Sequence, residues 1–144
     1  ALVGFIAMLI FLSVIFGYAF LFDKDENLEL YDAKMEVFSK NETESLEFYK
    51  YISIEDKGKL INRLDNEVIP KWNQNIEIIK QVMTIKEMPT ELVEQNKILL
   101  EYSELRLEAF KILKKAISEE TNIYDKELDV IHSKMDQNLK KLNN

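Results

Sequence analysis

A run of residues without a single charged side chain opens the sequence and limits its fold more than any other feature. Residues 1–22 read ALVGFIAMLIFLSVIFGYAFLF. As a helix rising ~1.5 Å per residue, this run reaches roughly 33 Å, which is enough to cross the hydrocarbon core of a bilayer. It has no polar stripe on any helical face, whereas a helix on the surface of a soluble domain carries one. We therefore predict a transmembrane helix over residues 1–22 and a polar domain over residues 23–144.

A secretory signal peptide is the alternative for the same run. Such a peptide has a basic start, a shorter apolar core and a small-residue cleavage site. Here the apolar run is longer, no Ala-x-Ala pattern ends it, and Tyr18 and Phe20 stand where cleavage would occur. An uncleaved signal anchor stays open. Because the sequence begins with Ala1, the run could also be the last of several spans in a longer chain.

The composition narrows the partners that the polar domain can have. The net charge of −7 belongs entirely to residues 23–144, because the preceding run is uncharged. An acidic surface repels phosphate backbones, so we expect no nucleic-acid partner. The sequence contains no cysteine, which excludes disulfides and thiolate chemistry. Its three glycines and two prolines favour long helices with short connections, and its bias towards Lys, Ile and Asn indicates a bacterial origin.

Apolar residues at helical spacing continue beyond residue 26 and predict an all-α fold without strands. We expect a first helix over about residues 27–53, with a break near residue 41, where Asn41 and Glu44 have the spacing of a capping box. A second helix is expected over about residues 54–87. Its apolar stripe crosses Pro70 without a change of register, which indicates a kink there rather than an end.

The third helix is expected over about residues 90–142, with a bend or break within residues 118–122, where the stripe has no apolar member. Short connections make successive helices antiparallel. The predicted fold is thus an N-terminal transmembrane helix followed by an elongated antiparallel three-helix bundle, or one of four segments. Only three lysines follow the span within residues 23–40, so we expect the bundle outside the cytoplasm.

The single histidine, His132, does not predict a metal site. Asp129 precedes it by three residues, but carboxylate-bridged metal sites in helical bundles use two such pairs with additional glutamates. Asp23, Asp25 and Glu26 resemble the opening of a calcium loop, yet the required glycine and distal glutamate are missing. We predict no metal-binding and no cofactor-binding residue.

Three glutamates on one helical face, Glu101, Glu104 and Glu108, do not predict acid–base catalysis. Such catalysis needs carboxylates in unequal, desolvated surroundings. Lys97 and Lys111 stand at helical-neighbour spacing from the three glutamates, which predicts exposed ion pairs. Ser13 lacks the flanking glycines of a serine nucleophile, so we predict no catalytic residue in this chain.

Trp72 and Arg106 are the candidates for docking a partner. Trp72 comes two residues after Pro70, and its simplest role is that of a core anchor, with docking at the kink as the alternative. Arg106 falls beside the apolar stripe of the third helix. It could be a partly buried residue that fixes helix register, or its stem could lie along the edge of the core.

Two strings of the sequence resemble a known family. They are Ile-Pro-Lys-Trp at residues 69–72 and NKILLEYSELRL at residues 96–107. They are similar to a helical extension after the final extra span of some bacterial rhomboid-family intramembrane serine proteases. The resemblance covers about residues 1–142. It implies catalytic spans upstream of Ala1, because the Gly-x-Ser-x-Gly serine and the histidine of the family are not in this chain, and it implies an extracytoplasmic bundle.

These patterns lead to one expected function and one alternative. We expect a non-catalytic, membrane-tethered accessory or interaction domain that contacts the lipid bilayer and a protein partner or substrate. In the version that the resemblance implies, it is the C-terminal part of a rhomboid-like protease. The alternative is a single-pass, membrane-anchored extracytoplasmic binding or sensor module unrelated to proteolysis.

Overall fold

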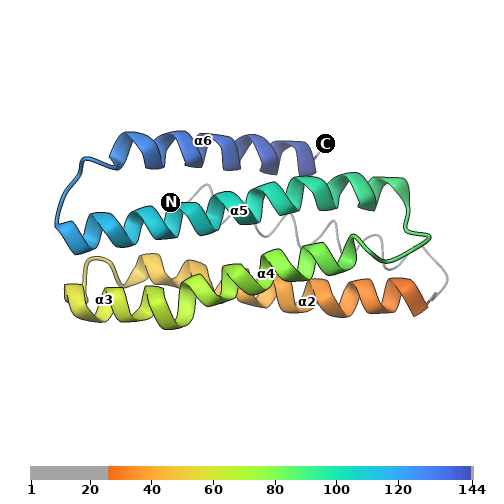
Figure 1. Cartoon of the computed structure of the whole chain (residues 1–144), viewed down its shortest axis with the longest axis horizontal. Coiled ribbons are helices and arrows are strands. Elements are labelled where there is room, and N and C mark those ends of the chain that lie inside the picture. Colours follow the sequence, from red (N-terminus) through yellow and green to blue (C-terminus); the bar gives the residue numbers. More distant parts are fainter. Residues whose placement is uncertain (1–25, 144) are drawn as a thin grey trace.

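The computed structural model describes residues 26–143, and this part of the chain is an all-helical bundle (Figure 1). No strand occurs between residues 26 and 143, as the periodicity predicts. The predicted transmembrane helix, residues 1–22, lies outside the described residues. Among the helices that are described, none combines the length and the apolar character needed to cross a membrane.

Helix α2 (Glu26–Leu46) differs from the expected first helix because it has no break near residue 41. It continues through Asn41 and Glu42 and ends at Leu46, where a 3₁₀ turn, η1 (Glu47–Lys50), follows. The physical reason is that Asn41 does not cap a helix: its side-chain amide donates hydrogen bonds to Gln74 and Asn75 on another helix. Because this amide bonds to another helix and not to the backbone of α2, the backbone hydrogen bonds of α2 continue past residue 41.

The second helical stretch is continuous across Pro70, as the unbroken stripe predicts. It consists of α3 (Lys57–Arg63), a π-helical segment η2 (Leu64–Val68) and α4 (Ile69–Val82). The Ile69 N–H bonds to the Leu64 carbonyl five residues back, directly before the proline. This wider turn accommodates the missing N–H of Pro70 and the clash that a proline makes with the carbonyl four residues earlier.

The buried residues on either side of Pro70 also favour this wider turn. They follow one another in steps of four. In an α-helix with 3.6 residues per turn, each step of four advances the side chain by about 40° around the axis. The π-helical segment absorbs this advance, so one face stays turned to the core. The residues concerned are Leu60, Leu64, Val68 and Trp72.

The expected third helix is divided in two. Helix α5 (Thr90–Glu119) ends at Glu120, which has left-handed backbone angles (φ 52°, ψ 47°), and α6 (Asp125–Leu142) follows after a short turn. This break lies where residues 118–122 lack an apolar member. Successive helices pack side by side, α2 on α4, α4 on α5 and α5 on α6, in alternating directions (Figure 1).

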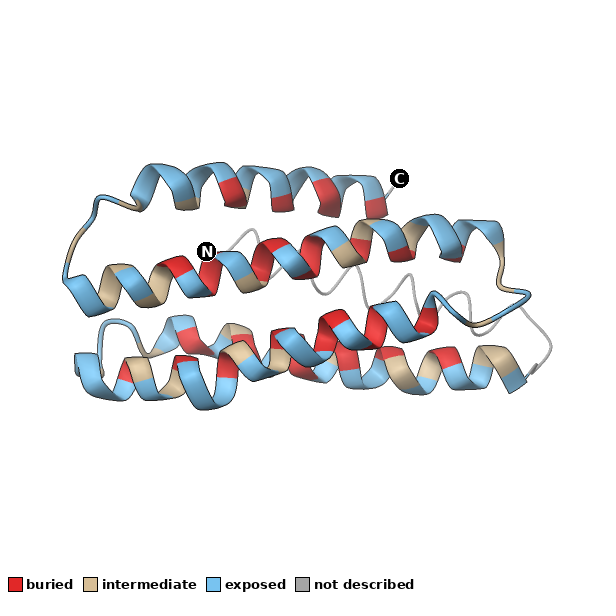
Figure 2. Cartoon of the chain, viewed as in Figure 1, coloured by how far each residue is buried: buried red, intermediate tan, exposed pale blue. Residues whose placement is uncertain are grey.

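The core runs along the length of the bundle as a strip of buried residues on the facing sides of the helices (Figure 2). Aromatic rings dominate its middle, where Trp72 meets Phe38 and Tyr102 edge-on at ring-centroid distances of 6.3 and 5.9 Å. Such edge-to-face packing adds to the stabilisation from burial alone. The largest fully buried side chains are Trp72, Tyr102, Phe38, Phe110, Met35, Leu64, Ile79, Leu99 and Val82.

The start of α3 offers a direct test of local structure. Asp56 is its N-cap, and the side-chain Oδ1 accepts a hydrogen bond from the Lys59 N–H at 2.9 Å. We expect Asp56→Ala to lower the melting temperature by a few degrees, because an unpaired N–H is left at the helix start. Thermal unfolding followed by circular dichroism measures this. Asp56→Asn, which keeps a capping oxygen, is the control and should retain most of the melting temperature.

Candidate functional site

The most distinctive polar feature of the described chain is a group of buried polar side chains in the middle of the bundle. We call it the polar cluster, and it consists of Asn41, Glu42, Asn75, Tyr102 and Arg106. The first two come from α2, the third from α4 and the last two from α5. Buried polar groups are stable only when they are hydrogen-bonded, so the partners of each member decide what the cluster does.

Glu42, Tyr102 and Arg106 form a chain of hydrogen bonds between α2 and α5. The Tyr102 hydroxyl donates to Glu42 Oε1 at 2.5 Å and accepts from Arg106 Nε at 3.0 Å. Burial raises the pKa of the Glu42 carboxyl, and this outweighs the opposite effects of the Tyr102 hydrogen bond and the Arg106 charge. Burial also raises the pKa of the Tyr102 hydroxyl. Tyr102 therefore stays a hydrogen-bond donor to Glu42 at neutral pH.

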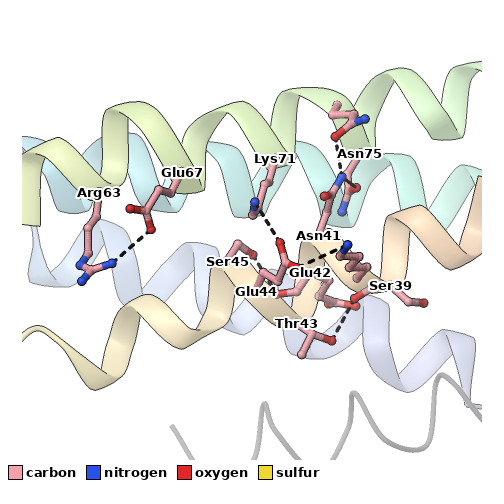
Figure 3. Close-up of polar contacts among 12 residues, drawn as sticks. Ser39, Asn41, Glu42, Thr43, Glu44, Ser45, Arg63, Glu67, Lys71 and Asn75 are labelled. Carbon is pink, nitrogen blue, oxygen red and sulfur yellow. Dashed lines mark hydrogen bonds and ion pairs between the residues drawn. The ribbon is translucent and has the colours of Figure 1, made fainter.

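The amides of Asn41 and Asn75 join α2 to α4. Asn41 Nδ2 donates to Gln74 Oε1 at 2.9 Å and to Asn75 Oδ1 at 3.0 Å (Figure 3). Asn75 Nδ2 in turn donates to the Phe38 carbonyl at 3.1 Å. Asn75 is fully buried, so these two bonds satisfy both ends of its amide inside the protein.

Ion pairs at the surface flank the polar cluster. Lys71 on α4 reaches Glu44 on α2 at 3.0 Å (Figure 3). At the end of α3, Arg63 pairs with Glu55 at 2.7 Å and with Glu67 at 3.2 Å (Figure 3 draws the second pair). These groups are partly exposed, and surface ion pairs contribute little to stability. Of these pairs, Lys71–Glu44 joins α2 to α4, whereas the Arg63 pairs are local to α3, η2 and the loop before them.

The structure places both docking candidates, Trp72 and Arg106, in the core. Trp72 is 0% exposed and Arg106 is 7% exposed. Neither side chain can contact a partner while the bundle is folded, so the docking role does not fit their burial. For Trp72 the core-anchor interpretation holds. For Arg106 the interpretation of a buried residue that fixes helix register fits its bond to Tyr102, because the Tyr102 hydroxyl in turn bonds to Glu42 on α2.

His132 lies half-buried on α6. Loss of water and the charge of Arg106 lower the pKa of its imidazole, while Asp136 and Asp129 raise it, and the net direction is downward. Within residues 26–143, no three His, Asp or Glu side chains are grouped so that they could hold a metal ion.

The glutamates Glu101, Glu104 and Glu108 are exposed on α5. The ion pairs expected for them are absent from the described part of the chain, because Lys97 pairs with Glu94 at 2.7 Å instead. Acid–base catalysis requires desolvated carboxylates, whereas exposed carboxylates keep their contact with water. The other candidates weighed from the sequence, Ser13, Asp23 and Asp25, lie outside the described residues.

Reasoning from the sequence missed Glu42 and Asn75 as interior residues. A signal for Glu42 was present: the buried residues of α2 follow steps of four and three without interruption, and a polar residue occupies the next inward position after Phe38. Extending the stripe through residue 41, instead of stopping it there, would have placed Glu42 inside. The buried positions of this stripe are Tyr31, Met35, Phe38, Glu42 and Ser45.

The hydrogen bonds of the polar cluster stay within the protein and fall into two groups, Glu42 with Tyr102 and Arg106, and Asn41 with Asn75. Its charged members, Glu42 and Arg106, both bond to Tyr102 and are turned away from solvent. A fully satisfied buried network rigidifies a core and can specify one packing arrangement. Comparison with known proteins adds no family: no family model, no curated protein and no solved structure matches the chain.

Proposed function

We propose that the chain is a membrane-tethered helical module that positions a protein partner beside a bilayer and supplies no catalytic group. The observation that carries this proposal is the uncharged run of residues 1–22 next to a domain that holds the entire net charge of −7. An apolar segment of this length is most stable in lipid, and an acidic domain is most stable in water. A chain with both parts is anchored at one end.

The bundle supports the interaction part of the proposal. Its buried charges, Glu42 and Arg106, are engaged with Tyr102 and none is aimed at a substrate. Its surface carries several exposed apolar side chains, of which Ile54 and Ile123 are the most accessible at 73% and 71%. Both lie in loops, where an apolar side chain is accessible to a protein partner.

The finer version of the proposal is the C-terminal part of a rhomboid-like intramembrane serine protease in a bacterial membrane. It rests on the strings at residues 69–72 and 96–107. Several residues of these strings, among them Trp72, Leu99 and Arg106, are core residues of the bundle. The strings therefore describe how such a bundle packs, and the catalytic serine and histidine would have to lie upstream. We place the bundle on the extracytoplasmic side, because few lysines follow the span.

Alkaline carbonate extraction of bacterial membranes tests the anchor. The full chain, with an initiating methionine, is expected to stay in the membrane pellet. Two arginines within residues 1–22, Leu9→Arg with Val14→Arg, should release it, because each costs about 2.5–3.5 kcal/mol at the centre of a span. The matched control is Leu30→Arg with Val37→Arg on α2, where both side chains are exposed (48% and 41%).

The control variant should remain in the pellet, as the unmodified chain does. If carbonate released the unmodified chain, membrane tethering would be contradicted. If the control were released as readily as the variant with Leu9→Arg and Val14→Arg, added charge alone would explain the release, and residues 1–22 would not be the anchor.

A further inference from the structure

A hollow lies where α5 turns into α6. Its volume is about 560 Å³. The floor is apolar and is formed by Leu113, Ala116 and Ile117, which share one face of the last turns of α5. The rim carries two carboxylates, Glu120 and Asp125, from the turn and from the start of α6. The hollow is shallow and wide open to solvent, so it suits a surface contact with a partner protein rather than an enclosed small-molecule site.

Glu120 holds an unusual position at this rim. Its backbone is left-handed (φ 52°, ψ 47°), a conformation that glycine adopts without strain and that a side chain disfavours. Its side chain is 76% exposed, and its ion pair with Lys57 is long, at 3.8 Å. Asp125 forms no ion pair with the described residues. Both carboxylates are thus open to a cation from outside.

The hollow is at the end of the bundle that lies away from the start of α2. Figure 1 shows the α5–α6 turn and the loop before α3 together at one end, and the start of α2 at the other. If residues 1–22 anchor the chain, the hollow is at the end of the bundle farther from the point where the chain enters α2. Ile123 and Ile54 are exposed in these two loops, so apolar surface continues beyond the hollow itself.

We propose that the α5–α6 hollow binds a short segment of a partner protein that carries an aliphatic side chain next to a lysine or arginine. The aliphatic group would cover Leu113, Ala116 and Ile117, and the cation would meet Glu120 and Asp125. The net charge of −7 favours a basic partner and disfavours anionic headgroups. This inference rests on the proposed interaction function and names the surface that performs it.

Fluorescence anisotropy with labelled peptides tests the inference on the full chain in a neutral detergent. The probe is fluorescein-Gly-Ser-Leu-Lys-Leu-Lys-Ser-Gly. In one control peptide both lysines are replaced by glutamate, and in the other both leucines are replaced by serine. We expect the probe to bind about tenfold more tightly than either control, and more weakly as salt rises. Absence of binding, or equal binding of the three peptides, would overturn the proposal.

Two matched variants separate the hollow from general charge effects. Glu120 and Glu87 are the non-glycine residues with left-handed backbones in the described chain, and Glu87 lies in the α4–α5 turn at the opposite end. Replacing either by glycine removes one negative charge and one backbone strain, so both variants should have a higher melting temperature. Only Glu120→Gly should weaken peptide binding, by about fivefold.

Equal weakening by Glu87→Gly would refute the hollow as the binding site. The result is independent of the anchor test. A chain that stays in carbonate-washed membranes but binds no peptide contradicts this inference alone, whereas a chain that binds the peptide but is extracted by carbonate contradicts the membrane tether alone.

Discussion

Replacing Trp72 with alanine is expected to lower the free energy of unfolding by about 3–5 kcal/mol. The indole is 0% exposed and packs edge-on against Phe38 of α2 and Tyr102 of α5. Alanine would leave a cavity where three helices meet, and the rings around it can collapse only in part. The total free energy of unfolding of a small domain is about 5–15 kcal/mol, so this variant should be close to unfolding.

Urea unfolding followed by far-ultraviolet circular dichroism measures the effect, because the signal does not depend on the indole. Trp72→Phe is the informative partner variant. The Trp72 Nε1 is buried without a hydrogen-bond partner in the described structure, so phenylalanine loses ring volume but no bond. It should be much less harmful than alanine. Ile54→Ala, at a side chain that is 73% exposed, should change stability little. If Trp72→Ala and Ile54→Ala had similar effects, the core anchor would be elsewhere.

The sequence was sufficient to predict the apolar core residues of the bundle. Trp72 could be assigned to the core because it continues a helical stripe, and the same stripe established that the helix does not end at Pro70. These predictions hold because the apolar side chains that are buried on one face of a helix recur at helical spacing, and this spacing can be seen in the sequence. The π-helical segment adds to this: the buried residues on either side of Pro70 advance in steps of four, so the sequence already contains the reason for a wider turn.

The polar interior could not be assigned in the same way. Asn41 and Glu44 have the residue types and the spacing of a capping box, and the same residue types also form buried bonds between helices. Asn41 is an interior residue because Asn75 is opposite to it on α4. That fact depends on how two distant segments pack. The same holds for Arg106, because the negative charge that it balances, Glu42, lies on another helix. The local sequence pattern allows both a capping role and a buried role for such a residue. The contacts between distant segments decide which role it has.

Arg106 gives the second large effect: Arg106→Ala is expected to lower the free energy of unfolding by about 3–5 kcal/mol at neutral pH. The guanidinium donates to Tyr102, which holds Glu42, and its charge opposes the rise in the pKa of the Glu42 carboxyl. Without it, Glu42 is a buried carboxylate that has only a tyrosine as its partner. The other arginine, Arg63, is the matched control. It is partly exposed in surface ion pairs, so Arg63→Ala should have a much smaller effect.

The loss of unfolding free energy in Arg106→Ala should depend on pH, and the pKa of the Glu42 carboxyl determines the direction. Burial raises its pKa in the folded state above the ordinary value of about 4.3, and removal of Arg106 raises it further. The stability that a protonated Glu42 provides is fully present below the unfolded pKa and is lost as pH rises through the folded pKa. The difference in the free energy of unfolding between the wild type and Arg106→Ala should therefore be smallest near pH 4.5 and largest near pH 8, as urea unfolding at both values would measure.

Adding Glu42→Gln to Arg106→Ala keeps an oxygen that accepts from Tyr102 and should abolish this dependence. A loss that stayed constant with pH in Arg106→Ala would mean that the guanidinium stabilises the bundle through packing of its stem, and that Glu42 does not need its charge.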